Sequence, residues 1–403
     1  MNIPHRLKRR HRLAGRSEGF AFFHKCKQGF EAFTLVETLV SLAIIALLLV
    51  ILLSMTNQIT ALWTYTSGRG EQFRESREAF ETITRRLSLA TLNTYWDYAD
   101  SSGNARTSAN SSTFTPVTYA RQSELRFISG PMGGSTSISG TTAPPAGASW
   151  PSQGVFFQAP RGVSEPGVST LSGLYSMLNT WGYFVEFGPD SSSRPGIPGL
   201  GDETRIPYKY RFRLCEMIQP ANQLSIYQYT SGPSGSPTYT GIDWFSASLG
   251  GTSRPVHVLA ENVIALVLLP KLASGDETAG GYTDSSLAPN YLYDSTGTNM
   301  GAAQLADKNL NPKNQLPPII QVTMVAVDEA SYGRFQSGTT MPANLGLATL
   351  FQTAGSTTDN TVPGYAKDLQ TLQNTLLANK INYRVFTSSI KIKGAKWSED
   401  QTN

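Results

Sequence analysis

The feature that most restricts the fold of this chain is an uninterrupted apolar segment near its N-terminus. Residues 33–53 read FTLVETLVSLAIIALLLVILL, and the apolar character continues to Met55. As a helix, residues 33–55 would be about 34 Å long, enough to cross a hydrocarbon core of about 30 Å. The segment therefore predicts a transmembrane helix. Its one acidic residue, Glu37, needs an explanation, because a carboxylate costs roughly 2.5–3.5 kcal/mol at the bilayer centre.

The charges on either side of this segment predict its orientation. Residues 1–32 carry eight lysine and arginine residues against two acidic ones, and the next basic residue after the segment is Arg69. By the positive-inside rule, we expect this leader in the cytoplasm and the chain after about residue 56 on the other side. A secretory signal peptide is the alternative, but its apolar region usually spans only about 7–15 residues after a short basic region.

The chain beyond the leader excludes several classes of site. It holds 25 basic and 27 acidic residues, so the basic character belongs to the leader. No basic patch with interleaved aromatic residues indicates a nucleic-acid partner. Cys215 is its single cysteine and His257 its single histidine, so an internal disulfide and a Cys/His zinc site are both excluded there.

Motifs for catalysis are weak. Residues 15–19 (GRSEG) match the G-x-S-x-G pattern, but they lie in the basic leader with no strand before them. A Ser-His-Asp triad would have to use His257, whose Val-His-Val context is typical of a strand, and Cys215 is interpreted as a small packed side chain. We therefore expect no catalytic residue. An anchored hydrolase that depends on His257 stays as a distant alternative.

An amphipathic continuation of the helix is predicted for residues 56–97. Its apolar stripe recurs at alternating spacings of three and four residues, the pattern of a helix facing a core. The stripe consists of Phe73, Ser76, Phe80, Ile83, Leu87 and Ala90. Gly68 and Gly70 predict a kink or a flexible neck before the stripe, and the helix is expected to end around residues 93–98.

Residues 98–403 are expected to form one β-rich globular domain with long surface loops. Candidate strands cover 123–129, 154–160, 182–188, 208–218, 224–230, 257–270, 319–327 and 383–392, with a helix at about 367–379. Long loops are expected at 99–122, 130–153, 188–206 and 273–316. Alternation of aromatic and basic residues from Tyr208 to Leu214 is typical of a half-exposed strand. The fold class predicted is α+β, with a long N-terminal helix packed on antiparallel β-sheet.

One acidic segment, GDETAGGYTDSS, raises the question of a metal ion. It contains Asp276, Glu277 and Asp284, and oxygen-rich loops can hold Ca²⁺. The spacing does not match an EF-hand, and a solvated loop is the interpretation that we favour. We expect no cofactor, with calcium at these three residues as the alternative.

The stretch AFTLVETLVSLAIIALLLV resembles the type III signal of type IV pilins and pseudopilins. In that family a prepilin peptidase cuts before a phenylalanine and methylates its new amino group, and a glutamate stands at the fifth mature position. The resemblance implies cleavage between Ala32 and Phe33, N-methylation of Phe33 and a role for Glu37 in assembly. Ala32 replaces the usual glycine but is also small. Paired with the amine of a neighbouring subunit, the Glu37 charge would be tolerable.

Longer segments carry a more specific resemblance. They are TLNTYWDYAD, SELRFISGP, VFFQAP, NTWGYFVEFG, YRFRLCEMIQP, LAENVIALVLLPKL, QLPPIIQVTMVAVDEAS and INYRVFTSSIKIKGAKWS. These look like the Verru_Chthon cassette protein C family, a set of pilin-like proteins encoded in cassettes with others of their kind. Wider relatives are minor pseudopilins of type II secretion, particularly the J-type. The resemblance implies a pilin-like fold and, as partners, other pilin-like subunits, the prepilin peptidase and an inner-membrane assembly platform.

The sequence and the resemblance together predict a structural subunit that crosses the inner membrane once, with its C-terminal domain in the periplasm. It would assemble into a pseudopilus or pilus, and its large head predicts a minor, tip-proximal position. The alternative is a membrane-anchored binding protein or adhesin that keeps its leader. In that case Glu37 would have no part in complex formation.

Overall fold

A computed structural model describes residues 34–103, 105–106, 110–133, 138, 142–164, 174, 176–191, 194, 206–226, 229–231, 237–239, 243–250, 254–336, 338–355 and 364–397. The chain divides into two compact units, Met1–Thr64 and Tyr65–Asn403. The leader (residues 1–32, which end at Ala32) and Phe33, the predicted first residue after cleavage, lie outside the described residues.

Helix α1 (Leu35–Leu87) begins inside the predicted transmembrane segment. The most apolar 18-residue stretch of its part Leu35–Thr60 has a mean hydropathy of 2.9, and among the described residues this is the one helix long and apolar enough to cross a membrane. The helix stays continuous through Gly68 and Gly70. It ends at Leu87, several residues earlier than predicted.

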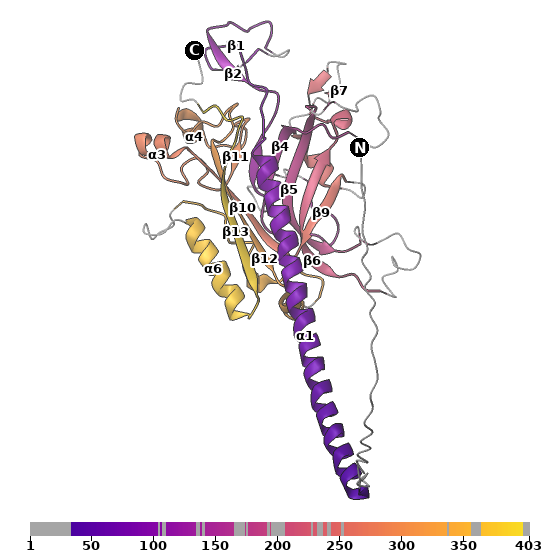
Figure 1. Cartoon of the computed structure of the whole chain (residues 1–403). Helices are drawn as coiled ribbons and strands as arrows, with labels where there is room; N and C mark the ends of the chain where they lie inside the picture. Colours follow the sequence, from indigo (N-terminus) through magenta and orange to yellow (C-terminus); the bar gives the residue numbers. More distant parts are fainter. Residues whose placement is uncertain are drawn as a thin grey trace, which may run out of the picture. The chain divides into compact units, whose positions relative to one another are not determined.

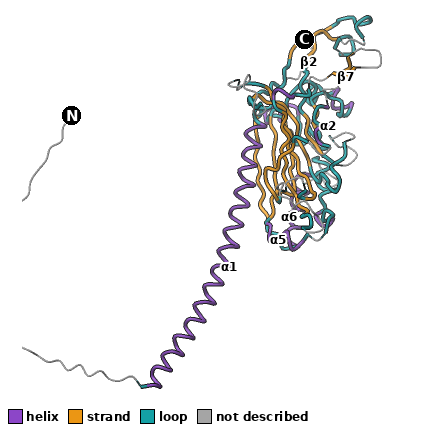
Figure 2. The backbone as a smooth tube through the Cα atoms, turned by 90° about the vertical axis from the view of Figure 1, so that its right-hand side faces the viewer, coloured by secondary structure: helices purple, strands orange, loops and turns teal. Residues whose placement is uncertain are grey.

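The second unit is built around antiparallel strands (Figures 1 and 2). The larger sheet has six strands in the order β11 (Tyr293–Asp294), β3 (Ile128–Pro131), β4 (Gln153–Pro160), β5 (Leu178–Pro189), β6 (Tyr210–Gln219) and β9 (Val256–Glu261). A three-stranded sheet has the order β10 (Val263–Lys271), β12 (Ile319–Val327) and β13 (Tyr383–Lys391). Two ribbons complete the sheets described: β1 (Tyr95–Ala99) with β2 (Thr118–Gln122), and β7 (Tyr229–Ser231) with β8 (Pro237–Tyr239).

Short helices connect these strands. They are α2 (Ser246–Leu249), α3 (Ser274–Gly280), α4 (Ala302–Ala306), α5 (Glu329–Phe335), α6 (Gly364–Ala378) and the 3-10 turns η2 (Ala221–Gln223) and η4 (Ala343–Leu345). The helix predicted near residues 367–379 is confirmed as α6, with Leu372 and Leu376 buried. Asp328 caps α5, because its carboxylate accepts a hydrogen bond from the Ser331 backbone N–H at 3.1 Å.

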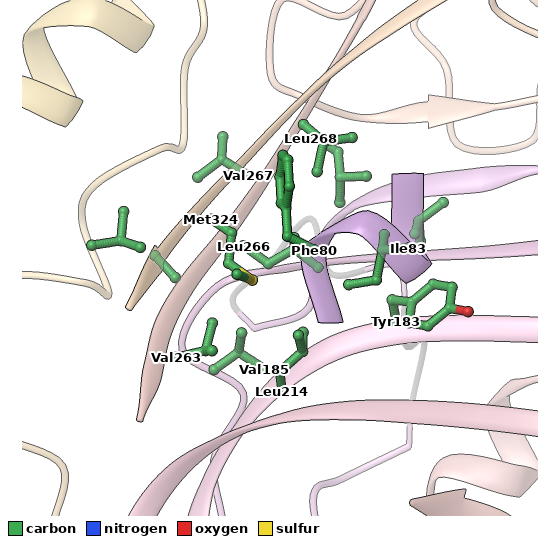
Figure 3. Close-up of a cluster of buried hydrophobic side chains, with 14 of the residues drawn as sticks. Phe80, Ile83, Tyr183, Val185, Leu214, Val263, Leu266, Val267, Leu268 and Met324 are labelled. Carbon is green, nitrogen blue, oxygen red and sulfur yellow. The ribbon is translucent and has the colours of Figure 1, made fainter. Parts of the chain in front are cut away.

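The main core lies between the two larger sheets and the C-terminal part of α1 (Figure 3). Phe80 and Ile83 of the helix lie close to Tyr183 of β5 and Leu214 of β6, with Leu266 of β10 nearby. The predicted helical stripe is confirmed as far as Leu87, since Ser76, Phe80, Ile83 and Leu87 are buried and Phe73 is half-buried. Ala90 is also buried but lies beyond the end of the helix. The apolar stripe is therefore the face of the helix that packs against the sheet side chains.

A second core covers the opposite face of the six-stranded sheet. There Phe156 stacks on Phe245 with ring centroids 4.5 Å apart, and Cys215 and Met217 are buried beside them. Burial on both faces from Phe212 to Met217 overturns the half-exposed strand predicted for residues 208–218 over most of its length, whereas Lys209 at its start is exposed as expected. The side chain of Arg213 is only 2% exposed, and its Nη1 donates a hydrogen bond to the Pro189 carbonyl oxygen at 2.8 Å.

The strand predicted over residues 257–270 is in fact two strands in different sheets. Between them, Asn262 has a φ of 58°, a left-handed conformation that asparagine tolerates better than most residues. The chain leaves β9, paired with β6, and enters β10, paired with β12. One residue with positive φ thus moves the chain from one sheet to the other.

Other predictions for the second unit were wrong in their boundaries. Strand β1 occupies the position where the helix was expected to end, and β2 lies inside the predicted loop 99–122. The predicted loop 273–316 contains α3, β11 and α4, and of the predicted strand 224–230 only the last two residues belong to β7. These elements have two to seven residues, too few to show a clear period in the sequence.

Candidate functional site

The first turn of α1 contains Glu37, the residue predicted to guide assembly. Its backbone N–H donates to Thr34 Oγ1 at 3.3 Å and to the Thr34 carbonyl oxygen at 3.0 Å, so Thr34 acts as a helix N-cap. A carboxylate in this first turn is favoured by the positive end of the helix dipole. Within the described part of the chain, no residue forms an ion pair or hydrogen bond with the Glu37 carboxylate.

The side chains around Glu37 form a continuous apolar surface. Leu35, Leu47 and Leu53 are 77%, 63% and 63% exposed, and the other large apolar residues of Leu35–Thr60 have similar values. A soluble monomer rarely exposes so large an apolar area, which usually marks contact with a membrane or with another protein. This helix is therefore chemically suited to spanning a membrane.

Several hydroxyl groups of the same segment are hydrogen-bonded within the helix itself. Thr38 Oγ1 donates to the Leu35 carbonyl oxygen at 2.9 Å, and Ser41 Oγ donates to that of Glu37 at 2.8 Å. Thr56 Oγ1 repeats the pattern at 2.8 Å, on the carbonyl oxygen four residues before it. Inside a hydrocarbon layer every polar group needs a partner from the protein, so the Glu37 carboxylate needs a partner from outside the described part of the chain.

The C-terminal end of α1 is attached to the six-stranded sheet by a buried ionic network. Arg86 Nη1 forms an ion pair with Glu216 Oε1 and donates to the Tyr183 hydroxyl at 3.0 Å, which in turn donates to Glu216 Oε1 at 2.8 Å. The Arg86 guanidinium also lies 4.4 Å from the centroid of the Trp181 ring. Desolvation lowers the pKa of Arg86 and raises that of Tyr183, as expected for groups removed from water.

The weak calcium candidates lie at and just beyond α3. Asp276 and Glu277 stand in its first turn, and Asp284 Oδ2 accepts from Lys271 Nζ at 2.5 Å. Burial, and then the charge of Asp284, raise the pKa of Glu277. Among the described residues, no three His, Cys, Asp or Glu side chains are grouped so that they could hold a metal ion. A cation of the chain itself already neutralises Asp284.

Cys215 and His257 occupy neighbouring strands. Cys215 is buried in β6, as predicted, and desolvation raises the pKa of its thiol and disfavours the reactive thiolate. His257 lies in β9, as its Val-His-Val context predicted, and its side chain is exposed. In the register of the sheet it stands opposite Glu216.

Sequence reasoning missed the buried charged pairs. Besides Arg86 with Glu216, Arg126 forms two hydrogen bonds with Asp294, and Arg254 two with Glu186. One signal was present for Arg86: it stands three residues after Ile83, beside the apolar stripe. The acidic partner, 130 residues further along the chain, could not be inferred from that position.

Comparisons with known proteins leave the family of the chain open. No protein-family model matches it, and searches of curated proteins and of solved structures find no match either. A function must therefore be argued from the residues and their geometry.

Proposed function

We propose that this chain is a non-enzymatic, pilin-like structural subunit, a minor pseudopilin of a type II secretion or type IV pilus-like assembly. The observation that carries the proposal is the contrast between two segments of helix α1. Its part Leu35–Thr60 exposes an apolar surface with a single carboxylate in the first turn, whereas residues 73–87 bury one face against antiparallel sheet. The resemblance of the sequence to the Verru_Chthon cassette protein C family supports the same assignment.

The mechanism that we propose begins with processing. The prepilin peptidase cuts between Ala32 and Phe33 and methylates the amine of Phe33. That amine then stands just before Thr34, the N-cap of α1, at one end of the apolar segment. There it is a cation that can pair with Glu37 of an adjacent subunit, since a charge surrounded by hydrocarbon is tolerable when it is paired.

The proposed location and partners follow from this mechanism. The helix holds the subunit in the inner membrane as a single span, with the leader in the cytoplasm and the second unit in the periplasm. Its partners are other pilin-like subunits, the prepilin peptidase and the assembly platform. A head of more than 300 residues would stack poorly many times over, which favours a minor position near the tip.

Mass spectrometry of the N-terminal peptide, from protein isolated from its native membranes, tests the processing step. The expected result is a peptide that begins with N-methylated Phe33. The variant Ala32→Gly should be processed like the native chain, whereas Ala32→Trp should keep its leader. An intact Met1 in the native protein would overturn the proposal and favour a plain anchor that carries a binding domain.

Copurification with other pilin-like subunits tests the role of Glu37. Glu37→Gln should reduce it strongly while membrane localisation stays unchanged. Glu78→Gln, which changes an exposed glutamate of the same helix, is the matched control. Thr34→Ala removes the helix cap, at a cost of about 0.5–2 kcal/mol, and shows how much of the effect is helix capping. Unchanged complexes in Glu37→Gln would contradict an assembly role.

A further inference from the structure

The ribbon formed by β1 and β2 presents an aromatic face. Trp96 is paired with Arg121 and Tyr98 with Tyr119, and residues directly opposite each other in a ribbon share a face. The rings of Tyr98 and Tyr119 have centroids 4.7 Å apart, and Arg121 Cζ lies 5.6 Å from the Trp96 ring centroid. The ribbon lies at one end of the second unit, as both views show (Figures 1 and 2). We call these four residues the ribbon face.

The three rings of the ribbon face are half exposed. Trp96, Tyr98 and Tyr119 keep 48%, 50% and 46% of their surface accessible. Along β1, Trp96 and Tyr98 are about 7 Å apart, so the ribbon face offers consecutive flat surfaces. Aromatic rings in this arrangement bind flat or ring-shaped ligands by stacking.

A polar cavity of about 150 Å³ adjoins the ribbon face. Its lining includes Trp96, Arg121, Gln315 and Lys396. Arg121 Nη1 donates to Gln315 Oε1 at 2.6 Å and to the Lys396 carbonyl oxygen at 3.3 Å, so the guanidinium is held in place by neutral acceptors.

The two cations of this cavity lack acidic partners in the described part of the chain. No described carboxylate forms an ion pair with Arg121 or Lys396. Asp97 alternates to the opposite face of β1. Desolvation lowers the pKa of Arg121, and a bound anion would raise it again by favouring the charged guanidinium. The charge of the cavity is therefore complementary to an anion.

The size of the ribbon face narrows the choice of ligand. Two strands of five residues cover about 17 Å by 10 Å, whereas a stable protein interface needs about 800 Å² on each partner. Single-stranded nucleic acid is bound along grooves lined with many cations, and the chain beyond its leader is close to neutral. A saccharide chain fits better, because the apolar faces of sugar rings stack on tryptophan and tyrosine.

We propose that the ribbon face and its cavity bind an anionic saccharide chain. Sugar rings stack on Trp96, Tyr98 and Tyr119, and the carboxylate of a uronic acid pairs with Arg121 and Lys396. This site is distinct from the assembly site at Glu37, and its occupation does not depend on cleavage before Phe33.

Calorimetric titration of the full chain in detergent micelles tests the proposal. The probes are an oligogalacturonate, a neutral glucose oligomer of the same length and a single-stranded thymidine oligomer. The oligogalacturonate should bind at least about tenfold more tightly than the neutral oligomer at low salt, and the gap should narrow at high salt. Absence of saccharide binding would overturn the proposal, as would tighter binding of the thymidine oligomer.

Variants locate the binding. Trp96→Ala should weaken oligogalacturonate binding at least about tenfold, and Trp96→Phe, which keeps a ring, should weaken it less. Lys396→Gln should lower the preference for the acidic over the neutral oligomer. Trp63→Ala, which changes a tryptophan 74% exposed in the first unit, is the control. Binding that is unchanged by both Trp96→Ala and Lys396→Gln would place the saccharide elsewhere and refute the proposal.

Discussion

Leu35–Thr60 and residues 73–87 belong to the same helix, yet their side chains have opposite surroundings. In the first segment Leu47 is 63% exposed, whereas in the second Ile83 and Leu87 are fully buried. Helical backbone geometry is common to both, so it does not decide burial. What decides it is the available partner: sheet side chains cover the second segment, and the first is apolar on every side.

The polar groups of the two segments differ in one respect, the partners of their charged side chains. The hydroxyls of Ser41 and Thr56 in the first segment donate to backbone carbonyl oxygens of the preceding turn. Ser76 in the second segment is buried, and its hydroxyl has no hydrogen-bond partner among the described residues. Both segments bond hydroxyls locally, since Thr84 Oγ1 of the second donates to the Glu81 carbonyl oxygen at 3.0 Å. The segment packed on protein in addition pairs the charge of Arg86 with a distant partner, Glu216.

The largest expected effect is that of breaking the ionic network at the end of α1. Arg86→Met leaves the Glu216 carboxylate, whose side chain is only 11% exposed, without its cation. Loss of one partner of a buried pair costs about 3–5 kcal/mol. Thermal unfolding of the full chain in detergent micelles, followed by near-ultraviolet circular dichroism, should show a markedly lower midpoint.

Arg85→Met is the matched control for this variant, because Arg85 precedes Arg86 and its side chain is exposed. It should change the midpoint little. The double variant Arg86→Met with Glu216→Gln should regain part of the lost stability, since it removes the unpaired charge. Equal effects of the two arginine variants would show that the network does not hold the helix.

The next effect compares two leucines of the same helix. Leu87→Ala removes a fully buried side chain and should cost about 3 kcal/mol of unfolding free energy through lost burial and a new cavity. Leu47→Ala makes the same chemical change at an exposed site and should leave the unfolding of the second unit unchanged. A similar loss in both variants would mean that residues around Leu47 also belong to the packed core.

The parts of the fold that the sequence predicts are those with long periodic patterns. The apolar stripe of α1 and the leucines of α6 repeat over several turns, and their faces are confirmed. The basic residues of β6 misled the prediction, because Arg213 alternates correctly but is covered by a second core. A one-dimensional pattern shows which residues share a face, but not whether another layer covers that face.

The candidate functional residues also differ in whether the sequence points to them. Glu37 is conspicuous in the sequence because it interrupts an apolar run, and the structure places it in the first turn of α1. The ribbon face joins residues 96–98 to residues 119–121, and Lys396 comes from the far end of the chain. Contacts over such separations depend on tertiary packing, for which local spacing gives no signal.

A smaller effect of opposite sign is expected at Ser76. Because its hydroxyl is buried without a described partner, Ser76→Ala should stabilise the second unit by about 1 kcal/mol. Ser41→Ala, which removes a hydroxyl bonded within the helix, should not raise the unfolding midpoint of that unit. A destabilised Ser76→Ala variant would show that the hydroxyl is bonded in solution, to water or to protein.

The smallest effect concerns two exposed glutamates of the second segment. Desolvation, and then repulsion from Glu261, raise the pKa of Glu75 above its usual value. A folded-state pKa above that of the unfolded chain means that the folded chain favours the protonated form. The charged form at pH 7 therefore destabilises the fold, and Glu75→Gln should stabilise it by a few tenths of a kcal/mol, since solvent screens the charge.

This gain should disappear as the pH falls below about 4, where Glu75 is protonated in both states. Glu78→Gln is the matched variant with the opposite sign, because Glu78 lies 3.7 Å from the Arg74 guanidinium one turn earlier, and loss of that pair costs a few tenths of a kcal/mol. Unfolding midpoints of both variants between pH 4 and pH 7 give the comparison. If Glu75→Gln failed to raise the midpoint at pH 7, the proximity of Glu75 to Glu261 would have no energetic consequence.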